Sequence, residues 1–307
     1  MEKISVTTGN KNTFLATLYK PQNEPIAVVQ ILHGMAEHQG RYKEFINFLI
    51  SKDIAVFIHD HLGHGDRIKV ESDKGYFGGY KGWDSVIEDA KSVSLKSKQI
   101  FPNIPLILLG HSMGSFVAFS LIESMDIYDS CILSAPSKPS KFLLFLQKFL
   151  LKSEVKKIGM QGYSQKIDDL IFGGFNKQIK NPKTPHDWLS HNEISVNSYL
   201  NDPLCGFKVT NALWLDLTDG IKTIYAKATL NSIPNNLSIL IMAGSNDPVG
   251  NNGKGPRNIL KLLKQFNKNA NLRLFENMRH EVLNETNNSI VYDEVFTYIM
   301  KNHGTLK

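Results

Sequence analysis

The chain has 307 residues, of which 42% are hydrophobic and 21% charged, a composition typical of a globular protein with room for a large core. Its formal charge of +6 comes from scattered lysines, whereas nucleic-acid sites favour clusters of lysine and arginine, so we expect no nucleic-acid partner. Two cysteines, no apolar run long enough to span a bilayer and no signal-peptide pattern predict a cytoplasmic protein without a disulfide framework.

Two short alternating stretches near the start, residues 4–7 and 13–19, are typical of an antiparallel hairpin at a sheet edge. After them, apolar runs of strand length alternate with helical patterns. We expect the further strands at residues 26–32, 54–58, 105–109, 130–134, 237–243 and 272–275. We expect the helices at residues 42–51, 83–97, 115–124, 259–265 and 291–300. This alternation predicts an α/β fold, with a mostly parallel sheet covered by helices on both faces.

The alternation stops between residues 135 and 234, where the pattern is helical and punctuated by turns. We therefore predict an inserted helical cap at residues 135–234 and a core formed by residues 1–134 and 235–307. Functional groups of such sheets gather beyond the carboxyl ends of the strands. The cap is expected to lie over that edge.

The segment Gly110-His111-Ser112-Met113-Gly114 lies between a predicted strand and a predicted helix. A G-x-S-x-G in this context presents its serine on a strained turn with the hydroxyl exposed. The glycines are expected because a side chain there would collide with the neighbouring strand and helix. A serine between glycines is also common in ordinary turns, but the flanking strand and helix favour a nucleophile.

A serine hydroxyl needs a base to take its proton, usually a histidine oriented by a carboxylate. After an elbow serine these partners are expected in the order Asp, then His. Asp247 and His280 each follow a predicted strand through a short turn. We therefore expect Ser112, Asp247 and His280 to be the catalytic residues. The rivals lie in the predicted cap and are His186, His191 and Asp219.

Acyl transfer also needs two backbone N–H donors for the oxyanion of the tetrahedral intermediate. One is expected at the residue after the nucleophile, Met113, and the other in the loop after residues 26–32, at Met35. Gly34 in this loop permits a close backbone approach. A simple polar connection between strand and helix is the alternative.

Residues 59–66 bring three histidines and two aspartates together within eight positions. Imidazole and carboxylate groups bind zinc, but the spacing lacks an H-E-x-x-H or zinc-finger pattern. We interpret the segment as a glycine turn beside the strand that precedes Ser112, with polar side chains that brace neighbouring loops. No metal and no cofactor are expected.

Residues 138–152 are the most apolar part of the predicted cap and are punctuated by lysines. One interpretation is a buried helix that packs on the core. The other is an interfacial helix, with its apolar face toward acyl chains and its lysines toward lipid headgroups. The second predicts Phe145 and Leu146 as substrate-binding residues and a transient contact with a membrane surface.

Together these motifs resemble the monoacylglycerol lipase and lysophospholipase branch of the α/β-hydrolase superfamily. In the core, the resemblance rests on His33-Gly34-Met35-Ala36-Glu37-His38, Arg41-Tyr42, Asp60-His61-Leu62-Gly63-His64-Gly65, Gly110-His111-Ser112-Met113-Gly114-Ser115, Asp247-Pro248 and His280-Glu281. In the cap, three segments resemble bacterial lysophospholipase-type members: Phe172-Gly173-Gly174-Phe175-Asn176, Asp187-Trp188-Leu189-Ser190 and Asp202-Pro203-Leu204-Cys205-Gly206-Phe207. The chain departs from the pattern at Leu62, where arginine is usual, and at Arg67, where serine or threonine is usual.

The residues and the resemblance predict a serine hydrolase that cleaves carboxylic esters of monoacyl lipids, either monoacylglycerols or lysophospholipids, through an acyl-enzyme. A peptidase or an acyltransferase with the same catalytic residues is one alternative. A non-catalytic ligand-binding protein of the same fold is another, and the intact serine, aspartate and histidine argue against it.

Overall fold

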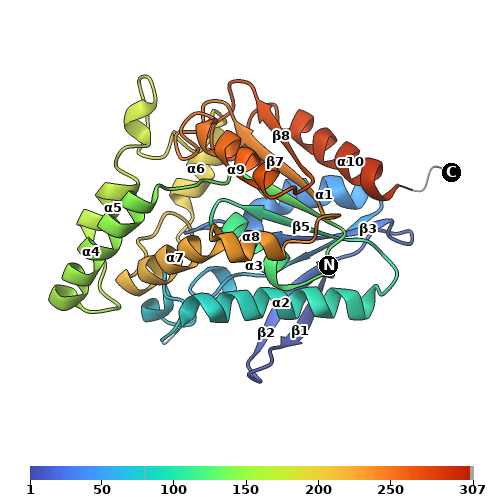
Figure 1. Cartoon of the computed structure of the whole chain (residues 1–307), viewed down its shortest axis with the longest axis horizontal. Coiled ribbons are helices and arrows are strands. Elements are labelled where there is room, and N and C mark those ends of the chain that lie inside the picture. The colour runs from blue at the N-terminus through green and yellow to red at the C-terminus, as the bar shows by residue number, and fades with distance from the viewer. Residues whose placement is uncertain (80, 305–307) are drawn as a thin grey trace.

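The computed structural model describes residues 1–79 and 81–304 and has an eight-stranded sheet at its centre (Figure 1). The strands are β1 (Glu2–Thr7), β2 (Thr13–Tyr19), β3 (Ala27–Leu32), β4 (Ile54–Ile58), β5 (Leu106–His111), β6 (Ser130–Ser134), β7 (Ser238–Gly244) and β8 (Ala270–Phe275). Their order in the sheet is β1-β2-β4-β3-β5-β6-β7-β8. The hairpin β1–β2 is antiparallel and joins β4 antiparallel, and the other neighbours are parallel.

Helices cover both faces of the sheet, so every residue of the interior strands β3 to β7 is buried. The helices of the core are α1 (Lys43–Ser51), α2 (Gly82–Ile100), α3 (Met113–Ser124), α9 (Lys254–Gln265) and α10 (Ser289–His303). One apolar layer contains side chains of α1 and α10, and the other contains those of α2, α3 and α9. The predicted α/β fold is confirmed, and the predicted strands lie within a few residues of the observed ones.

Between β6 and β7 the described chain is helical and contains no strand. Its helices are α4 (Lys141–Ile158), α5 (Gln165–Ile171), α6 (Glu193–Asn201), α7 (Asn211–Ile224) and α8 (Lys227–Ser232). Helix α7 packs against α4 on one side and against the core helices α2 and α3 on the other. Helices α4 and α5 lie at one end of the molecule, away from α10 (Figure 1).

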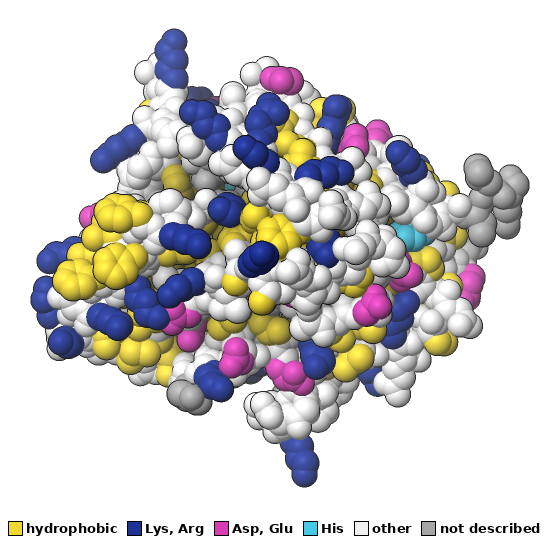
Figure 2. Space-filling model, viewed as in Figure 1, with side chains coloured by type: hydrophobic (Ala, Val, Ile, Leu, Met, Phe, Trp, Pro, Cys, Tyr) yellow, Lys and Arg dark blue, Asp and Glu magenta, His cyan; other side chains and the backbone are white. Residues whose placement is uncertain are grey.

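Helix α4 has two different faces. Leu144, Gln147 and Leu151 are buried, whereas Phe142 and Phe145 are more than 70% exposed. Figure 2 shows hydrophobic side chains gathered on the surface over this end of the molecule, with lysines around them. Within the described residues, no helix combines the length and the apolar character needed to cross a membrane.

Candidate active site

Ser112 occupies the turn between β5 and α3, with φ of 50° and ψ of −116°. Residues other than glycine rarely adopt such angles. A Cβ atom at Gly110 would lie 2.2 Å from the carbonyl oxygen of Gly114, and one at Gly114 would lie 2.1 Å from that of Leu32. No side chain fits at either position. The predicted strained turn, and the reason for its glycines, are confirmed.

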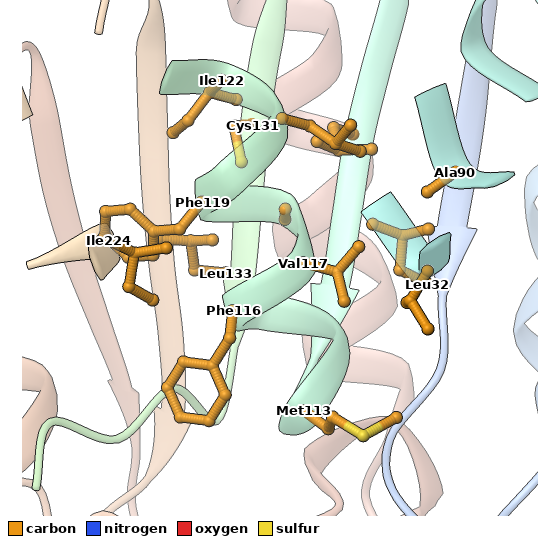
Figure 3. Packing of buried hydrophobic residues seen from close by; sticks show 14 of the residues in the cluster. Leu32, Ala90, Met113, Phe116, Val117, Phe119, Ile122, Cys131, Leu133 and Ile224 are labelled. Atoms are coloured by element: carbon orange, nitrogen blue, oxygen red, sulfur yellow. The ribbon is translucent and has the colours of Figure 1, made fainter. Parts of the chain in front are cut away.

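Helix α3 holds this turn in place because most of its side chains are buried. Figure 3 shows Phe116, Val117 and Phe119 of α3 in one apolar layer with Leu32 and Leu133 of the sheet. Close packing of this kind allows little movement of a backbone segment. The serine at the start of α3 is therefore rigidly supported.

Two loops from the carboxyl ends of β7 and β8 meet Ser112. Nε2 of His280 lies 2.9 Å from Oγ of Ser112, and Nδ1 of His280 lies 3.0 Å from Oδ2 of Asp247. The side chains of His280 and Asp247 are 3% and 0% exposed. With the Nδ1 proton donated to the carboxylate, Nε2 is free to accept the serine proton.

The charges around His280 favour its protonated form. Burial, the largest single effect, would lower the pKa of His280, but the charge and hydrogen bond of the Asp247 carboxylate, together with the charges of Glu281 and Glu37, outweigh it and raise the pKa above its usual value. Burial lowers the pKa of the adjacent His111, and His280 lowers it further. Of these two imidazoles, His280 is the one suited to hold a proton next to Ser112.

The two expected oxyanion donors lie close to the serine. Met113 is the first residue of α3, and the first N–H groups of a helix have no partner within it. Met35 lines the same cavity as Ser112, in the loop after β3. A Cβ atom at Gly34 would lie 3.4 Å from the Cβ of Ser112, so this loop passes very close to the serine. The positions suit oxyanion binding, and the roles of Met35 and Met113 remain predictions.

Two cavities meet at Ser112 and His280. The first has a volume of 570 Å³ and contains most of the charged and polar lining side chains, which are Glu37, Gln165, Asp168, Asp169, Asn176, His186, Tyr199, Lys208 and Glu281. The second has a volume of 470 Å³ and is walled mainly by apolar side chains, which include Phe116, Leu143, Leu144, Leu170, Ile171, Phe175, Trp214, Leu217 and Ile221. Met35, Phe172 and Trp188 line both cavities.

A sequence model of the family described as "Serine aminopeptidase, S33" matches residues 23–287 of the chain. The chain belongs to this family. It is 26% identical to human monoglyceride lipase over 286 residues, which cover 90% of this chain and 83% of that protein. It is 24% identical to phospholipase YtpA of Bacillus subtilis over 280 residues, 88% of this chain and 93% of that one. A carboxyl esterase from Bacillus coagulans, solved in complex with glycerol, superposes with a TM-score of 0.86 at 25% identity, covering 98% and 96% of the two chains.

These relationships confirm the predicted α/β-hydrolase branch of monoglyceride lipase-like proteins and identify the chain as a carboxylic ester hydrolase. The family description names an aminopeptidase, whereas the three relatives are a lipase, a phospholipase and an esterase. A fold of this kind accommodates many substrates. The substrate must therefore be argued from the cavities.

The assignment of Phe145 and Leu146 as substrate-binding residues is not supported by their positions. Phe145 is 71% exposed, and neither side chain lines a cavity beside Ser112. Along a helix, residues three or four positions apart share a face. The face of α4 toward the apolar cavity carries Leu143, Leu144 and Gln147, and Phe145 projects away from it. Sequence could identify the helix, but not which of its faces turns inward.

The histidine-rich loop at residues 59–66 is buried, but it does not lie beside the strand that precedes Ser112. Strand β3 separates β4 from β5 in the sheet, so the loop after β4 neighbours the β3 loop instead. There the backbone N–H of His61 donates to Nε2 of His33 at 3.0 Å. Asp60 accepts hydrogen bonds from the backbone of Gln39 and Asp66 at 2.8 and 2.9 Å. The loop thus braces the segment that follows β3.

Unfolding should become easier in mild acid because of this loop. Both ring nitrogens of His59 and His61 are buried without hydrogen-bond partners in the described structure. Burial lowers the pKa of His59 and His64 to about 3, with smaller contributions from neighbouring charged groups. The unfolded chain, in which the pKa is about 6.5, then binds protons first, so stability falls as the pH drops below 6.5.

Each such histidine should lower the free energy of unfolding by about 1.4 kcal/mol per pH unit once it is protonated in the unfolded chain. Urea titrations between pH 7.5 and 5 measure this slope. His59→Phe, which keeps a flat ring at a position without hydrogen bonds, should make the slope shallower. A variant with an unchanged slope would show that His59 is not the source of the acid sensitivity.

A different group of side chains lies close enough to share a metal ion. Within the described residues, this group is His38, Asp202 and Cys205, whose ligand atoms lie within 4.8 Å of one another. Nε2 of His38 is already 2.9 Å from Asp202, and burial raises the pKa of the Cys205 thiol. A metal would need a deprotonated thiolate and a free imidazole nitrogen. These contacts favour a structural role over metal binding: the His38–Asp202 pair joins the loop after β3 to the segment after α6.

The rival candidates for the catalytic acid and base make other contacts and do not bond to Ser112. Asp219 is half-exposed and pairs with Lys148 of α4. His191 pairs with Glu285 at 3.0 Å. His186 lines the polar cavity, and its ring lies 5.2 Å from that of Tyr199.

One aromatic residue and one ionic cluster beside the site could not be predicted from the sequence. Trp188, whose ring centroid lies 5.3 Å from that of His280, lines both cavities. In the sequence, only the family resemblance of the segment Asp187-Trp188-Leu189-Ser190 points to this residue. Arg41, Glu37 and Glu281 form a buried ionic cluster beside His280. The sequence offers one clue to this cluster: Arg41 is one of few arginines, and the motifs at residues 33–42 and 280–281 contain the acidic residues. No local pattern predicts that positions 41 and 281 meet.

Proposed function

We propose that the protein hydrolyses the ester bond of monoacyl lipids, with Ser112 as nucleophile, His280 as general base and acid, and Asp247 as the group that orients His280. The observation that carries the proposal is the continuous hydrogen-bond chain from Ser112 through His280 to Asp247, at the junction of a strongly apolar cavity and a second cavity that carries more charged and polar side chains. Such a chain activates a serine hydroxyl for attack on an acyl carbonyl.

In this mechanism, Oγ of Ser112 attacks the ester carbonyl while Nε2 of His280 takes its proton. The negative oxygen of the intermediate binds the N–H groups of Met35 and Met113. His280 then donates the proton to the leaving alcohol, which departs and leaves an acyl-serine. Water, deprotonated by His280, attacks the acyl-serine. His280 then returns this proton to Oγ of Ser112 as the fatty acid departs. Asp247 stabilises the imidazolium in both steps.

The two cavities suit the two parts of a monoacyl lipid. The apolar cavity, with walls such as Phe116, Leu217 and Ile221, offers an acyl chain an apolar surface. The other cavity, with Gln165, Asn176 and other polar groups, offers hydrogen bonds to a small alcohol. Residues 135–234 contribute walls to both, which supports our proposal that this segment is a cap domain over the core.

A second candidate has one specific observation in its favour. Gln165, Asp168 and Asp169 of α5 line the polar cavity, and acidic cap residues there would suit the amino group of a short peptide. The apolar cavity argues for an acyl chain instead. A panel of a long-chain monoacylglycerol, a lysophospholipid and an aminoacyl nitroanilide separates the candidates. We expect fatty-acid release from a monoacyl lipid, and faster cleavage of the nitroanilide would favour the peptidase.

We also propose that the exposed aromatic face of α4 contacts a lipid surface. Phe142, Phe145 and Phe149 are 76%, 71% and 65% exposed, and lysines of the same helix surround them (Figure 2). Apolar side chains that enter a lipid interface while lysines meet anionic headgroups are typical of interfacial helices. Access to lipid substrates would follow from this contact.

Replacing Phe142, Phe145 and Phe149 together with serine should reduce binding to anionic vesicles by about tenfold or more, since each aromatic ring contributes its apolar area. Hydrolysis of a long-chain monoacylglycerol in vesicles should slow in parallel. Hydrolysis of a soluble acetate ester and the melting temperature should stay close to the wild-type values, because the three rings are exposed. Unchanged vesicle binding would refute the lipid contact.

A further inference from the structure

A buried ionic cluster lies next to the proposed catalytic residues and takes no part in the mechanism above. The side chains of Arg41, Glu37 and Glu281 are 7%, 4% and 5% exposed. Nε of Arg41 lies 3.4 Å from Oε2 of Glu37, and its Nη2 contacts Oε2 of Glu281. Burial of charges is costly unless they are paired. Arg41 donates a hydrogen bond to Glu281, whereas its Nε has no hydrogen-bond partner in the described structure and meets Glu37 as an ion pair only.

Glu37 is attached to the loop after β3. Its Oε1 accepts the backbone N–H of Gly34 at 2.5 Å and the hydroxyl of Tyr42 at 2.8 Å. Gly34 directly precedes Met35. A displacement of the Glu37 carboxylate would therefore move the N–H group that we assign to the oxyanion.

Glu281 is attached to the loop that carries His280. It is the next residue in the chain, its backbone N–H donates to the carbonyl of Leu189 at 2.7 Å, and its Oε2 accepts from Nδ2 of Asn284 at 3.1 Å. Arg41 thus spans two loops that are 240 positions apart in the sequence. Its guanidinium also lies 4.9 Å from the ring centroid of Tyr199 in α6.

We propose that Arg41 is a positioning residue: by pairing with Glu37 and Glu281 at once, it fixes the Gly34–Met35 segment and His280 relative to each other. The proposal rests on the proposed function, because it takes Met35 and His280 in the roles given above. A buried ion pair adds little net stability compared with apolar packing. The location of its two anchors, one on each loop, accounts better for the presence of this cluster.

The cluster also influences the charge around His280. Glu281 and Glu37 favour protonated His280 in addition to the larger effect of Asp247. Burial and the neighbouring Glu281 raise the pKa of Glu37, although Arg41 opposes this effect. His111 is the other titratable side chain that faces His280, with ring centroids 5.1 Å apart, and burial keeps it neutral. Loss of the Glu281 charge should therefore make His280 a weaker base.

Arg41→Gln removes the bridge, and kcat for nitrophenyl acetate should fall about 10²-fold, as expected when catalytic groups shift by a fraction of an ångström to an ångström. KM for this small ester should hardly change. Arg41→Lys keeps the positive charge but lacks the planar guanidinium that can reach two carboxylates at once, so its kcat should lie between those of Arg41→Gln and the wild type. Arg67→Gln is the matched control, since it breaks the buried Arg67–Asp89 pair, which is attached to neither loop. The control should lose stability and keep its kcat.

Glu281→Gln tests the charge separately. Glutamine can still accept from Arg41, but it removes a negative charge that faces His280. The acid limb of the pH profile of kcat/KM should move to lower pH by about half a unit, since that limb reports the free-enzyme base. A purely structural role would lower the melting temperature and leave the limb unmoved.

Two results would each overturn the proposal: a kcat for Arg41→Gln as high as that of Arg67→Gln, or an unmoved acid limb in Glu281→Gln. If Arg41→Gln does not fold, Arg41→Lys and Glu281→Gln decide the question. A wild-type protein that cleaves the acetate but no monoacyl lipid would refute the proposed substrate and leave this comparison valid. A protein that cleaves no ester would refute both.

Discussion

Ser112→Ala is expected to lower the rate of ester hydrolysis by about four orders of magnitude or more, while the protein stays folded. The hydroxyl of Ser112 has its hydrogen bond with His280, and the remaining side chain is a single carbon that alanine retains. The strained backbone at φ of 50° is the same for both residues. Turnover of a nitrophenyl ester and the melting temperature are the two measurements.

Ser124→Ala provides the control for this variant. Ser124 ends the same helix, is exposed, and donates to the carbonyl of Ser120 at 2.7 Å, far from the cavities. Its loss should leave turnover unchanged. Retention of more than about a hundredth of the wild-type rate in Ser112→Ala would mean that another group attacks the ester.

Asp247→Asn is expected to cost about 10⁴-fold in kcat, whereas Asp219→Asn should change kcat by less than about twofold. Asp247 is fully buried and accepts the Nδ1 proton of His280 at 3.0 Å. Asparagine keeps the shape, but its amide group can donate to Nδ1, which would leave the proton on Nε2, where it blocks acceptance from Ser112.

Asp219 is the matched acid because it pairs with Lys148 on the surface of the segment between β6 and β7. Exposed pairs of this kind contribute little to stability. Steady-state kinetics on both variants, with circular dichroism to check folding, give the comparison. Equal losses, or a larger loss at position 219, would identify the wrong acid in our assignment.

The elements of the core could be predicted from sequence because each has a strong local signal. Strands such as β5 and β7 are buried on both faces, so their apolar runs are continuous and end at turn residues. The turn at Ser112 was predictable for the same reason, since its glycines lie where a Cβ atom would meet backbone atoms. Ser112, Asp247 and His280 were chosen by their order along the chain, and the structure brings them into one hydrogen-bonded chain. Their catalytic roles stay predictions.

The inner and outer faces of α4 could not be predicted from sequence. Leucine and phenylalanine occur all around this helix, so its hydrophobic pattern gives no clear direction. Burial of Leu144 and exposure of Phe145 are decided by packing against α7, a segment some 70 positions later in the chain. The prediction that the 59–66 loop lies beside β5 is wrong for a related reason: no single segment of the sequence reveals the order of the strands in the sheet.

The Arg41 cluster illustrates the same limit for the site. Each of its residues lies in a motif, and Arg41 is one of few arginines in the chain. Pairing across 240 positions depends on the parallel strands β3-β5-β6-β7-β8, which place the loops after β3 and β8 at the same, carboxyl, edge of the sheet. Only the folded structure joins them.

The most direct test of the account is to label the protein with a long-chain alkyl fluorophosphonate and to locate the adduct by peptide mass spectrometry. We expect one adduct, on the peptide that contains Ser112, absent from Ser112→Ala and formed more slowly when a long-chain monoacylglycerol competes for the cavities. An adduct on a different residue, or labelling at Ser112 that a monoacylglycerol does not slow, would contradict the proposal that Ser112 attacks the ester of a monoacyl lipid.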